Sequence, residues 1–179
     1  MEEVVRVATK EDEDEVMRLL HMMHSEGGLM PLDEMSAHEM FQKAFNRHGA
    51  ILGVIGDPGD IKAMIFLLIG KFWYTQSYHL EELFNFIRPD KRKSDYSDRM
   101  INFAKKCAEE TKLPLVIGVL TNSRMAGKVR LYRRHLGYPA GAFFVYNAAW
   151  INEPSGKDFW KKPFYGNNNL LDVDGHKGA

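Results

Sequence analysis

Apolar residues along this chain gather in short runs separated by polar turns, and the spacing within the runs predicts both strands and helices. Residues 50–55 and 61–69 are two such runs, and the residues DPGD at 57–60, which precede the second run, favour a tight turn. The two runs are therefore predicted to form a β-hairpin. Residues 80–87 and 115–120 are rich in aliphatic or aromatic residues with little alternation, which is typical of strands buried on both faces.

Helices are predicted where apolar residues recur every three or four positions. The first follows an approximate capping box, Thr9-x-x-Asp12, and should end near residue 24 or 25, before two glycines. The second follows the capping-box pattern Ser36-x-x-Glu39. The third should be capped at residue 94 or 95, and the fourth should begin near residue 122 or 123.

Two short strands complete the predicted elements, one at residues 4–8 and the last at 142–149. The predicted order is then β-α-α-β-β-β-α-β-α-β, which favours a mixed α/β (α+β) fold. Residues 1–151 are expected to form a single domain, because the chain contains no linker and no internal repeat. The polar residues 152–179 are expected to be a partly flexible extension.

Composition limits the classes of function. The 24 basic residues balance the 24 acidic ones, so there is no general charge to bind nucleic acid or an anionic membrane. The single cysteine, Cys107, excludes an internal disulfide and is expected to be an inert core thiol, and no metal site is expected. No apolar run approaches the roughly 20 residues that span a bilayer. A cytoplasmic location without membrane association is therefore expected.

Residues 80–98, LEELFNFIRPDKRKSDYSD, combine a strand, a basic turn and the start of a helix. Pro89 ends the strand, and Lys91, Arg92 and Lys93 place three cations in the turn. A turn that leads into a helix directs free backbone N–H groups toward one point, so this stretch is predicted to bind an anion. A nucleic-acid patch is the weaker interpretation, because the run is short and contains an acidic residue.

The sequence Ile87-x-Pro89-x-x-Arg92-x-x-Asp95-x-Ser97 resembles the acetyl-CoA-binding signature of the GNAT acetyltransferase superfamily, V-x-P-x-x-[RQ]-x-x-G-x-[GA]. The apolar residue, the proline and the arginine match, whereas Asp95 and Ser97 replace the two glycines. An aspartate adds negative charge beside the phosphates, which the neighbouring cations could offset. Because aspartate tolerates positive φ better than most residues, the loop could keep its path.

Two more similarities support the resemblance. The predicted order of elements is that of the GNAT fold. Residues 131–138, LYRRHLGY, are close to the family's L-Y-x-x-x-G-F, with one extra residue between the tyrosine and the glycine. Asn122 lies farther upstream of this tyrosine than the family's usual asparagine.

The resemblance implies a GNAT fold, with a mixed central β-sheet flanked by about four helices and with acetyl-CoA as the cosubstrate. It also implies that residues 83–87 diverge from strand 115–120 and open a cleft for the thioester arm. Backbone groups of 85–87 would then bind the pantetheine, and the N–H groups of 93–98 would hold the pyrophosphate. The residues thus implied in coenzyme binding are Asn85, Phe86, Ile87, Arg92, Lys93, Ser94, Asp95, Tyr96, Ser97, Asp98 and Asn122.

Acetyl transfer to an amine requires one group that accepts a proton from the amine and another that protonates the leaving thiolate. Tyr132 occupies the family's usual position for the proton donor, although a tyrosine on a helix is more often a core aromatic. Glu81 and Glu82 lie where some family members place a general base, and solvated charge at a strand end is the alternative. Strand alternation puts the two side chains on opposite faces, so at most one should point into the cleft. Glu81 is narrowly preferred as the base, and a bulge in the strand would invert this choice. His79 could serve instead, but a structural role is commoner.

Two functions remain open on the sequence alone. The first is an N-acetyltransferase that moves an acetyl group from acetyl-CoA to a primary amine by direct attack, with no covalent enzyme intermediate. The second is a catalytically inactive domain of the same fold that binds the coenzyme or a partner, which the replaced glycines favour. No motif specifies whether the amine-bearing acceptor is a small molecule or a protein, and the chain could form a homodimer.

Overall fold

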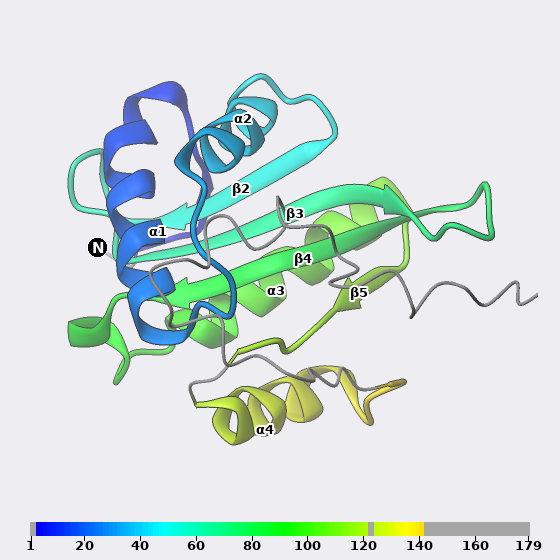
Figure 1. Ribbon diagram of the computed structural model, residues 1–179. Helices are drawn as coiled ribbons and strands as arrows, with labels where there is room; N and C mark the ends of the chain where they lie inside the picture. Colours follow the sequence, from blue (N-terminus) through cyan, green and yellow to red (C-terminus); the bar gives the residue numbers. More distant parts are fainter. Residues whose placement is uncertain (1–2, 122–123, 142–179) are drawn as a thin grey trace, which may run out of the picture. The chain divides into compact units, whose positions relative to one another are not determined.

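A five-stranded sheet forms the centre of the structure (Figure 1). The computed structural model describes residues 3–121 and 124–141, and every element named below belongs to one structural unit, residues 1–28 and 32–143. The strands are β1 (Arg6–Val7), β2 (Ala50–Ile55), β3 (Ala63–Lys71), β4 (Tyr78–Ile87) and β5 (Leu115–Ile117). They lie side by side in the order of the sequence. All neighbours are antiparallel except β4 and β5, which are parallel.

The predicted β-hairpin is confirmed as the pair β2 and β3, in which Ile55 pairs with Ala63. The N–H group of Asp60 donates to the carbonyl oxygen of Asp57 at 3.0 Å and closes the turn. Gly59 has a φ of 86° there, a conformation that glycine adopts without the steric cost of a Cβ atom.

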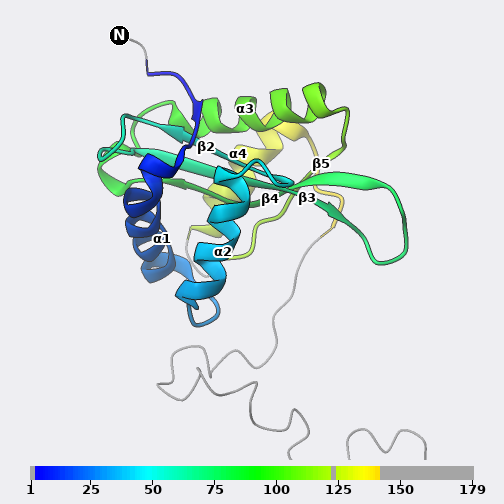
Figure 2. The ribbon, with the colours of Figure 1, turned by 90° about the horizontal axis from the view of Figure 1, so that it is seen from above.

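Helices cover both faces of the sheet (Figure 2). Helices α1 (Glu13–Gly27) and α2 (Glu34–Phe45) lie on one face, and α3 (Tyr96–Thr111) lies on the other. Helix α4 (Met125–Leu136) follows β5. Two short 3₁₀ helices, η1 (Lys10–Asp12) and η2 (Pro89–Lys91), lead toward α1 and α3.

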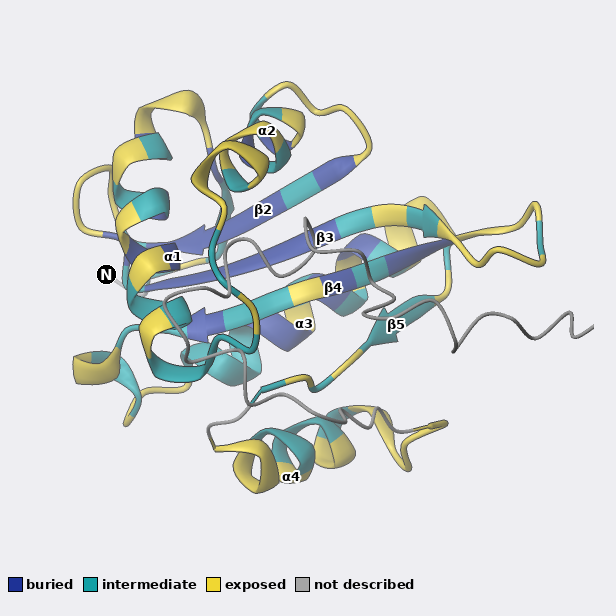
Figure 3. Ribbon diagram, in the orientation of Figure 1, coloured by how far each residue is buried: buried dark blue, intermediate teal, exposed yellow. Residues whose placement is uncertain are grey.

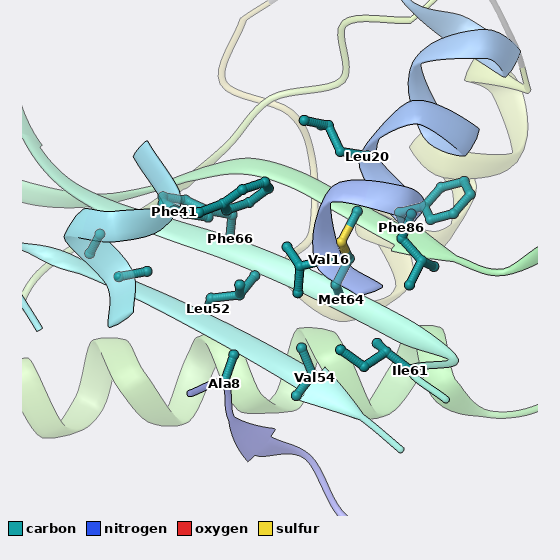
Figure 4. Packing of buried hydrophobic residues seen from close by; sticks show 13 residues of the cluster. Ala8, Val16, Leu20, Phe41, Leu52, Val54, Ile61, Met64, Phe66 and Phe86 are labelled. Atoms are coloured by element: carbon teal, nitrogen blue, oxygen red, sulfur yellow. The ribbon is translucent and has the colours of Figure 1, made fainter. Parts of the chain in front are cut away.

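Apolar side chains fill a core on each face of the sheet. Beneath α1 and α2, Val16 and Phe41 pack with Met64 and Phe66 of β3 (Figure 4). On the other face, α3 packs on the residues that alternate with these along β3, including Ile65. Strand β3 is therefore buried on both faces, which explains its unbroken apolar sequence.

The prediction that residues 80–87 are buried on both faces is confirmed only in part, because the strand contacts both cores but Leu83 is 43% exposed. Leu80 belongs to the core beneath α3, whereas Phe86 belongs to the core beneath α1 and α2. Strand β5 does not match its prediction: its three residues are only partly buried, and pairing stops before Gly118 (Figure 3). Cys107 lies on the buried side of α3, and burial raises the pKa of its thiol to about 11, as expected for an inert thiol.

Several predicted element boundaries are corrected. Helix α1 continues to Gly27, and its C-cap residue Gly28 ends it with an extended ψ of 132° rather than with a left-handed conformation. Helix α2 begins two residues before Ser36, because the carboxylate of Asp33 accepts the Ser36 N–H at 2.8 Å and caps the helix earlier. The first capping box is confirmed by the Thr9 N–H group, which donates to an Asp12 carboxylate oxygen at 2.8 Å.

Some predictions fall outside the described residues. One is the start of the fourth helix at residue 122 or 123. The others are the strand at 142–149, the domain boundary at 151 and the extension that follows this boundary. Within the residues that the structure does describe, no helix has both the length and the apolar character needed to cross a bilayer.

Candidate functional site

Strands β4 and β5 run in parallel for only a short distance and then diverge (Figure 1). Leu80 pairs with Leu115, and the pairing ends where Glu82 meets Ile117. Beyond that point, the only strand that pairs with residues 83–87, within the described part of the chain, is β3. The divergence that the sequence resemblance implied is therefore present, and it leaves backbone N–H and C=O groups of β4 for another partner.

A β-bulge in β4 lies at the point of divergence. Phe84 pairs with Phe66 of β3, but the next pair joins Glu82 to Leu67, so Leu83 has no partner in β3. Residues that pair across two strands point to the same face, and Leu67 lies in the core beneath α3. Glu82 therefore points toward the α3 face of the sheet. This geometry places Glu82, and not Glu81, on the α3 face, because the extra residue changes the alternation on which the narrow preference for Glu81 was based.

Glu82 meets Tyr132 of α4 on this face. The Tyr132 hydroxyl lies 3.1 Å and 3.2 Å from the two carboxylate oxygens of Glu82 and donates its proton to them. Glu82 is only 6% exposed. Burial raises the pKa of Glu82 from its ordinary value of 4.5 to about 7, against the opposing effects of the Tyr132 hydrogen bond and the Lys128 charge. Burial and the adjacent carboxylate raise the pKa of Tyr132 well above its ordinary value.

Glu81 and His79 lie away from this pair. The Glu81 side chain is about half exposed, and its nearest carboxylate oxygen is 3.9 Å from Nε2 of His79. The His79 ring is buried and stacks on Phe72 with ring centres 4.4 Å apart. These contacts favour the structural role for His79 that the sequence made the commoner alternative.

Arg92 holds the basic turn against α1. One guanidinium nitrogen lies 2.5 Å from a carboxylate oxygen of Glu26, and Nε donates to the carbonyl oxygen of Ile87 at 3.0 Å. The guanidinium carbon also lies 5.5 Å from the centre of the Phe86 ring. The sequence resemblance assigned the Arg92 charge to the phosphates, but in the structure that charge is already paired with Glu26.

The other two cations of the turn are less constrained. Lys91 lies 3.4 Å from Asp90, whereas Lys93 is exposed and forms no ion pair within the part of the chain that the structure describes. Helix α3 begins just after them, with Asp95 as its N-cap residue. Its first N–H groups therefore face the position that was predicted to bind the pyrophosphate.

The two replaced glycines do not distort the turn. Asp95 has a φ of −87°, and no described residue from 88 to 98 has a positive φ, so the backbone here does not need the freedom of glycine. The Asp95 carboxylate lies 2.8 Å from Nε of Arg99, which offsets its charge. The tolerance of aspartate for positive φ is therefore not used at Asp95.

Further contacts join α3 to its surroundings. Ser94 donates to the Lys91 carbonyl oxygen at 2.6 Å, and the Tyr96 hydroxyl donates to Glu3. An Asp98 carboxylate oxygen lies 2.5 Å from Nε2 of His135 and 2.7 Å from a guanidinium nitrogen of Arg134, which ties α3 to α4. The Ser94 hydroxyl oxygen also accepts the Tyr96 N–H at 3.3 Å, so one N–H group of the first turn of α3 is already bonded within the chain.

The sequence reasoning missed two residues of the site. Lys128 lies one helical turn before Tyr132 on α4, and burial lowers its pKa even though the charge of Glu82 raises it. The i,i+4 spacing of Lys128 and Tyr132 was the available signal. Glu26 was missed because its partner Arg92 lies 66 positions away in the sequence. Within the described ranges, no group of three His, Cys, Asp or Glu side chains is arranged to hold a metal ion.

Replacing Arg92 with alanine should destabilise the fold. The change removes charged hydrogen bonds to Glu26 and to the Ile87 carbonyl oxygen, and we expect the free energy of unfolding to fall by about 1.5 to 3 kcal/mol. Urea unfolding measures this difference. The matched control is Lys93→Ala in the same turn, which should change stability by less than about 0.5 kcal/mol. Equal effects of the two changes would contradict the bracing role of Arg92.

Several solved structures with the same architecture carry the names of acetyltransferases. No protein-family model and no curated protein matches the sequence. The structure resembles a ribosomal-protein-alanine N-acetyltransferase from Brucella melitensis biovar Abortus 2308, with a TM-score of 0.64 and 16% identity over 82% of this chain and 99% of that one. It also resembles a predicted acetyltransferase with acetyl-CoA from Clostridium acetobutylicum, with a TM-score of 0.64 and 12% identity over 82% of this chain and 96% of that one.

A third similar structure is that of AAC(6')-Iy in complex with the bisubstrate analogue CoA-S-monomethyl-acetylneamine. Its TM-score is 0.60, at 12% identity over 82% of this chain and 97% of that one. The sheet, the helices and the divergent parallel strands define an α+β fold that this chain shares with these structures. The chain has the GNAT acetyltransferase fold.

Proposed function

We propose that this protein is an acetyl-CoA-dependent N-acetyltransferase that transfers the acetyl group directly to a primary amine. The hydrogen-bonded pair of Glu82 and Tyr132 carries this proposal. The pair supplies a carboxylate with a pKa near neutral pH and a phenol that stays protonated, and it lies where β4 and β5 diverge. A base and an acid side by side are what the reaction requires.

The proposed reaction uses Glu82 as the base and Tyr132 as the acid. The amine nitrogen attacks the thioester carbonyl carbon, a C–N bond forms, and the ammonium proton passes to Glu82. The carbonyl re-forms as the C–S bond breaks, and the sulfur takes the proton of the Tyr132 hydroxyl. Protonated Glu82, whose carboxylate lies 3.1 Å from the tyrosine oxygen, then returns a proton to the phenolate. The products are the acetylated amine and free CoA, and both side chains regain their starting state.

The coenzyme would bind along the edge of β4 and at the start of α3. Residues 83–87 offer backbone groups to the amides of the pantetheine arm, as β-strands offer them to a neighbouring strand. The first N–H groups of α3 and the exposed Lys93 would hold the pyrophosphate. The names of the similar structures support this assignment, since one contains acetyl-CoA and another contains a CoA bisubstrate analogue.

A coenzyme-binding domain without catalysis is the second candidate. Asp95 and Ser97 favour it, because each adds a side chain where the family signature has glycine and backbone groups would approach the pyrophosphate closely. The retained Glu82–Tyr132 pair favours the enzyme, since binding alone requires neither a base nor an acid.

Ligand binding and turnover separate the two candidates. We expect acetyl-CoA and CoA to raise the melting temperature, with a stabilisation of about 2.7 kcal/mol at a hundredfold excess over Kd. ADP, which lacks the pantetheine arm, should stabilise the protein less. Mass spectrometry of a panel of amines with acetyl-CoA should then detect an acetylated product. A shift without any product would favour the binding domain, and the absence of both would contradict both candidates.

A further inference from the structure

The C-terminal turn of α1 contacts both of the segments that follow the diverging strands β4 and β5. After β4, a guanidinium nitrogen of Arg92 lies 2.5 Å from a carboxylate oxygen of Glu26. After β5, the Thr121 hydroxyl donates to the carbonyl oxygen of Gly27 at 3.4 Å. The end of α1 is therefore held at the side of the site where the two strands separate.

Glu26 occupies an unfavourable position for an acidic residue. It is the last residue but one of α1, and the C-terminal end of a helix carries the negative end of the helix dipole, so an anion there lowers stability. Its side chain is 30% exposed, and water and salt screen a partly buried charge less than a surface charge. The ion pair with Arg92 compensates for both effects, so the end of α1 becomes less stable when Arg92 takes another partner.

Contacts other than Glu26 fix the guanidinium of Arg92. Nε donates to the carbonyl oxygen of Ile87 at 3.0 Å, and the guanidinium carbon lies 5.5 Å from the centre of the Phe86 ring. The bonds to Ile87 and Glu26 use two of the five N–H donors, and the others bond to none of the residues that the structure describes. A planar group with further donors is suited to bind phosphate oxygens.

The position assigned to the pyrophosphate lies next to this ion pair. Arg92 precedes Asp95, the N-cap residue of α3, by three positions, and the first N–H groups of α3 are those assigned to the pyrophosphate. An anion bound there attracts Arg92 and repels Glu26. Glu26 and the ligand therefore compete for the same cation.

We propose that Glu26 is an affinity-determining residue of the coenzyme site, which holds Arg92 in the free protein and loses it to the phosphates of acetyl-CoA. The guanidinium exchanges a carboxylate for a phosphate and keeps its contacts with Ile87 and Phe86. Coenzyme binding then loosens the end of α1, and Glu26 weakens the binding because its ion pair must be broken. This role rests on the coenzyme site of the proposed function and needs none of its chemical steps.

Glu26→Gln tests the exchange, because it removes the charge and keeps the shape of the side chain. The variant should be less stable than the wild-type protein without ligand, yet bind CoA and ADP about 10-fold more tightly, since no charge-assisted hydrogen bond has to be broken. Urea unfolding measures the stability, and isothermal titration measures the two Kd values. Unchanged or weaker binding would overturn the proposal.

The matched control is Glu110→Gln, which makes the same change of charge in the last turns of α3, at the opposite end from the assigned pyrophosphate position. Glu110 also belongs to an ion pair, with Lys106 at 3.7 Å. The Kd for CoA and ADP should stay within about twofold of the wild-type values, because salt screens distant exposed charges. An equal gain in this control would show a general effect of net charge and would overturn the proposal.

A double-mutant cycle separates the exchange of Arg92 from simple repulsion between Glu26 and the ligand. Arg92→Gln removes the cation and introduces a residue that the family signature also has at this position. In this background Glu26→Gln should change the Kd for ADP by less than about twofold, since no ion pair remains to be broken. An undiminished gain in affinity would show repulsion alone and would overturn the role of the ion pair.

Amide hydrogen exchange of the wild-type protein requires no variant. Peptides that cover residues 22–28 should exchange faster with CoA bound, because the end of α1 loses its partner. Slower or unchanged exchange in the complex would overturn the proposal. Faster exchange and tighter binding by Glu26→Gln, without any acetylated amine, would overturn only the proposed reaction. If neither the wild-type protein nor Glu26→Gln bound CoA or ADP, the coenzyme site and this role of Glu26 would both be overturned.

Discussion

Glu82→Gln should lower kcat by about 10²- to 10⁴-fold, the range expected for the loss of a general base. Glutamine keeps the shape of the side chain and can still accept the hydrogen bond of Tyr132 through its amide oxygen, but it cannot take a proton from the amine. The Kd for acetyl-CoA should therefore stay nearly the same. Steady-state kinetics together with isothermal titration of acetyl-CoA separate these two effects.

The matched control is Glu81→Gln, one residue earlier on the same strand. Its side chain is about half exposed and lies toward His79 rather than Tyr132, so kcat should hardly change. A large loss of kcat in Glu81→Gln, together with an active Glu82→Gln, would contradict the assignment of Glu82 as the base. It would restore Glu81, the residue preferred from simple strand alternation.

The pH dependence should identify the base. Because the pKa of Glu82 is raised to about 7, kcat of the wild-type protein should rise with pH through about 7, and this acid limb should be absent from the residual activity of Glu82→Gln. Stability should change in the opposite direction. Below about pH 4.5 the carboxyl is protonated in both states, and as the pH rises to about 7 only the unfolded state ionises, so roughly 3 kcal/mol of stability is lost. Glu82→Gln should remove that loss and melt at a higher temperature at pH 8.

Tyr132→Phe should lower kcat by roughly 10- to 1000-fold with little change in coenzyme Kd, because the ring remains and only the proton donor is lost. The raised pKa of Tyr132 keeps the phenol protonated at ordinary assay pH, so the wild-type protein should show no alkaline limb from this group. The acid limb should move to higher pH in the variant, since Glu82 loses the hydrogen bond that lowers its pKa. Initial rates across a pH series measure both effects.

Tyr138→Phe provides the control for Tyr132, because Tyr138 is 86% exposed and belongs to the same motif of the sequence. It should retain full activity. If Tyr132→Phe were equally active and its acid limb were unmoved, Tyr132 would be a core aromatic and not the acid. His135, the nearest alternative on α4, is already paired with Asp98 at 2.5 Å and is a poorer candidate.

Much of the fold could be predicted from the sequence because its main signals are local. The turn at 57–60 fixes the β2–β3 hairpin, and the basic turn before α3 has the capping residue and the apolar spacing that start a helix. Tyr132 was found because the pattern around it is also local. Errors of a few residues at the ends of α1 and α2 arose where two capping signals compete within one turn.

The pairing within the site could not be predicted because it depends on contacts across the sheet. The choice between Glu81 and Glu82 depends on the register of β3 against β4, and no residue near Leu83 marks a bulge. Likewise, Arg92 matches the coenzyme signature by position, but its pairing with Glu26 depends on where α1 ends in space. The raised pKa of Glu82 follows from burial, which the sequence of residues 80–87, with little alternation, does not specify.

The unpaired residue of β4 also bears on how readily another chain could add a strand to the sheet. A long, flat strand edge is a template on which another chain can add a strand, and β4 presents such an edge where β5 leaves it. Leu83 interrupts the regular spacing of that edge at its first free residue, and bulges of this kind increase the local twist and hinder edge-to-edge pairing. The inserted residue thus has two consequences. It places Glu82 and Asn85 on the same face of β4, and it makes the edge of β4 a poor match for a strand of another chain.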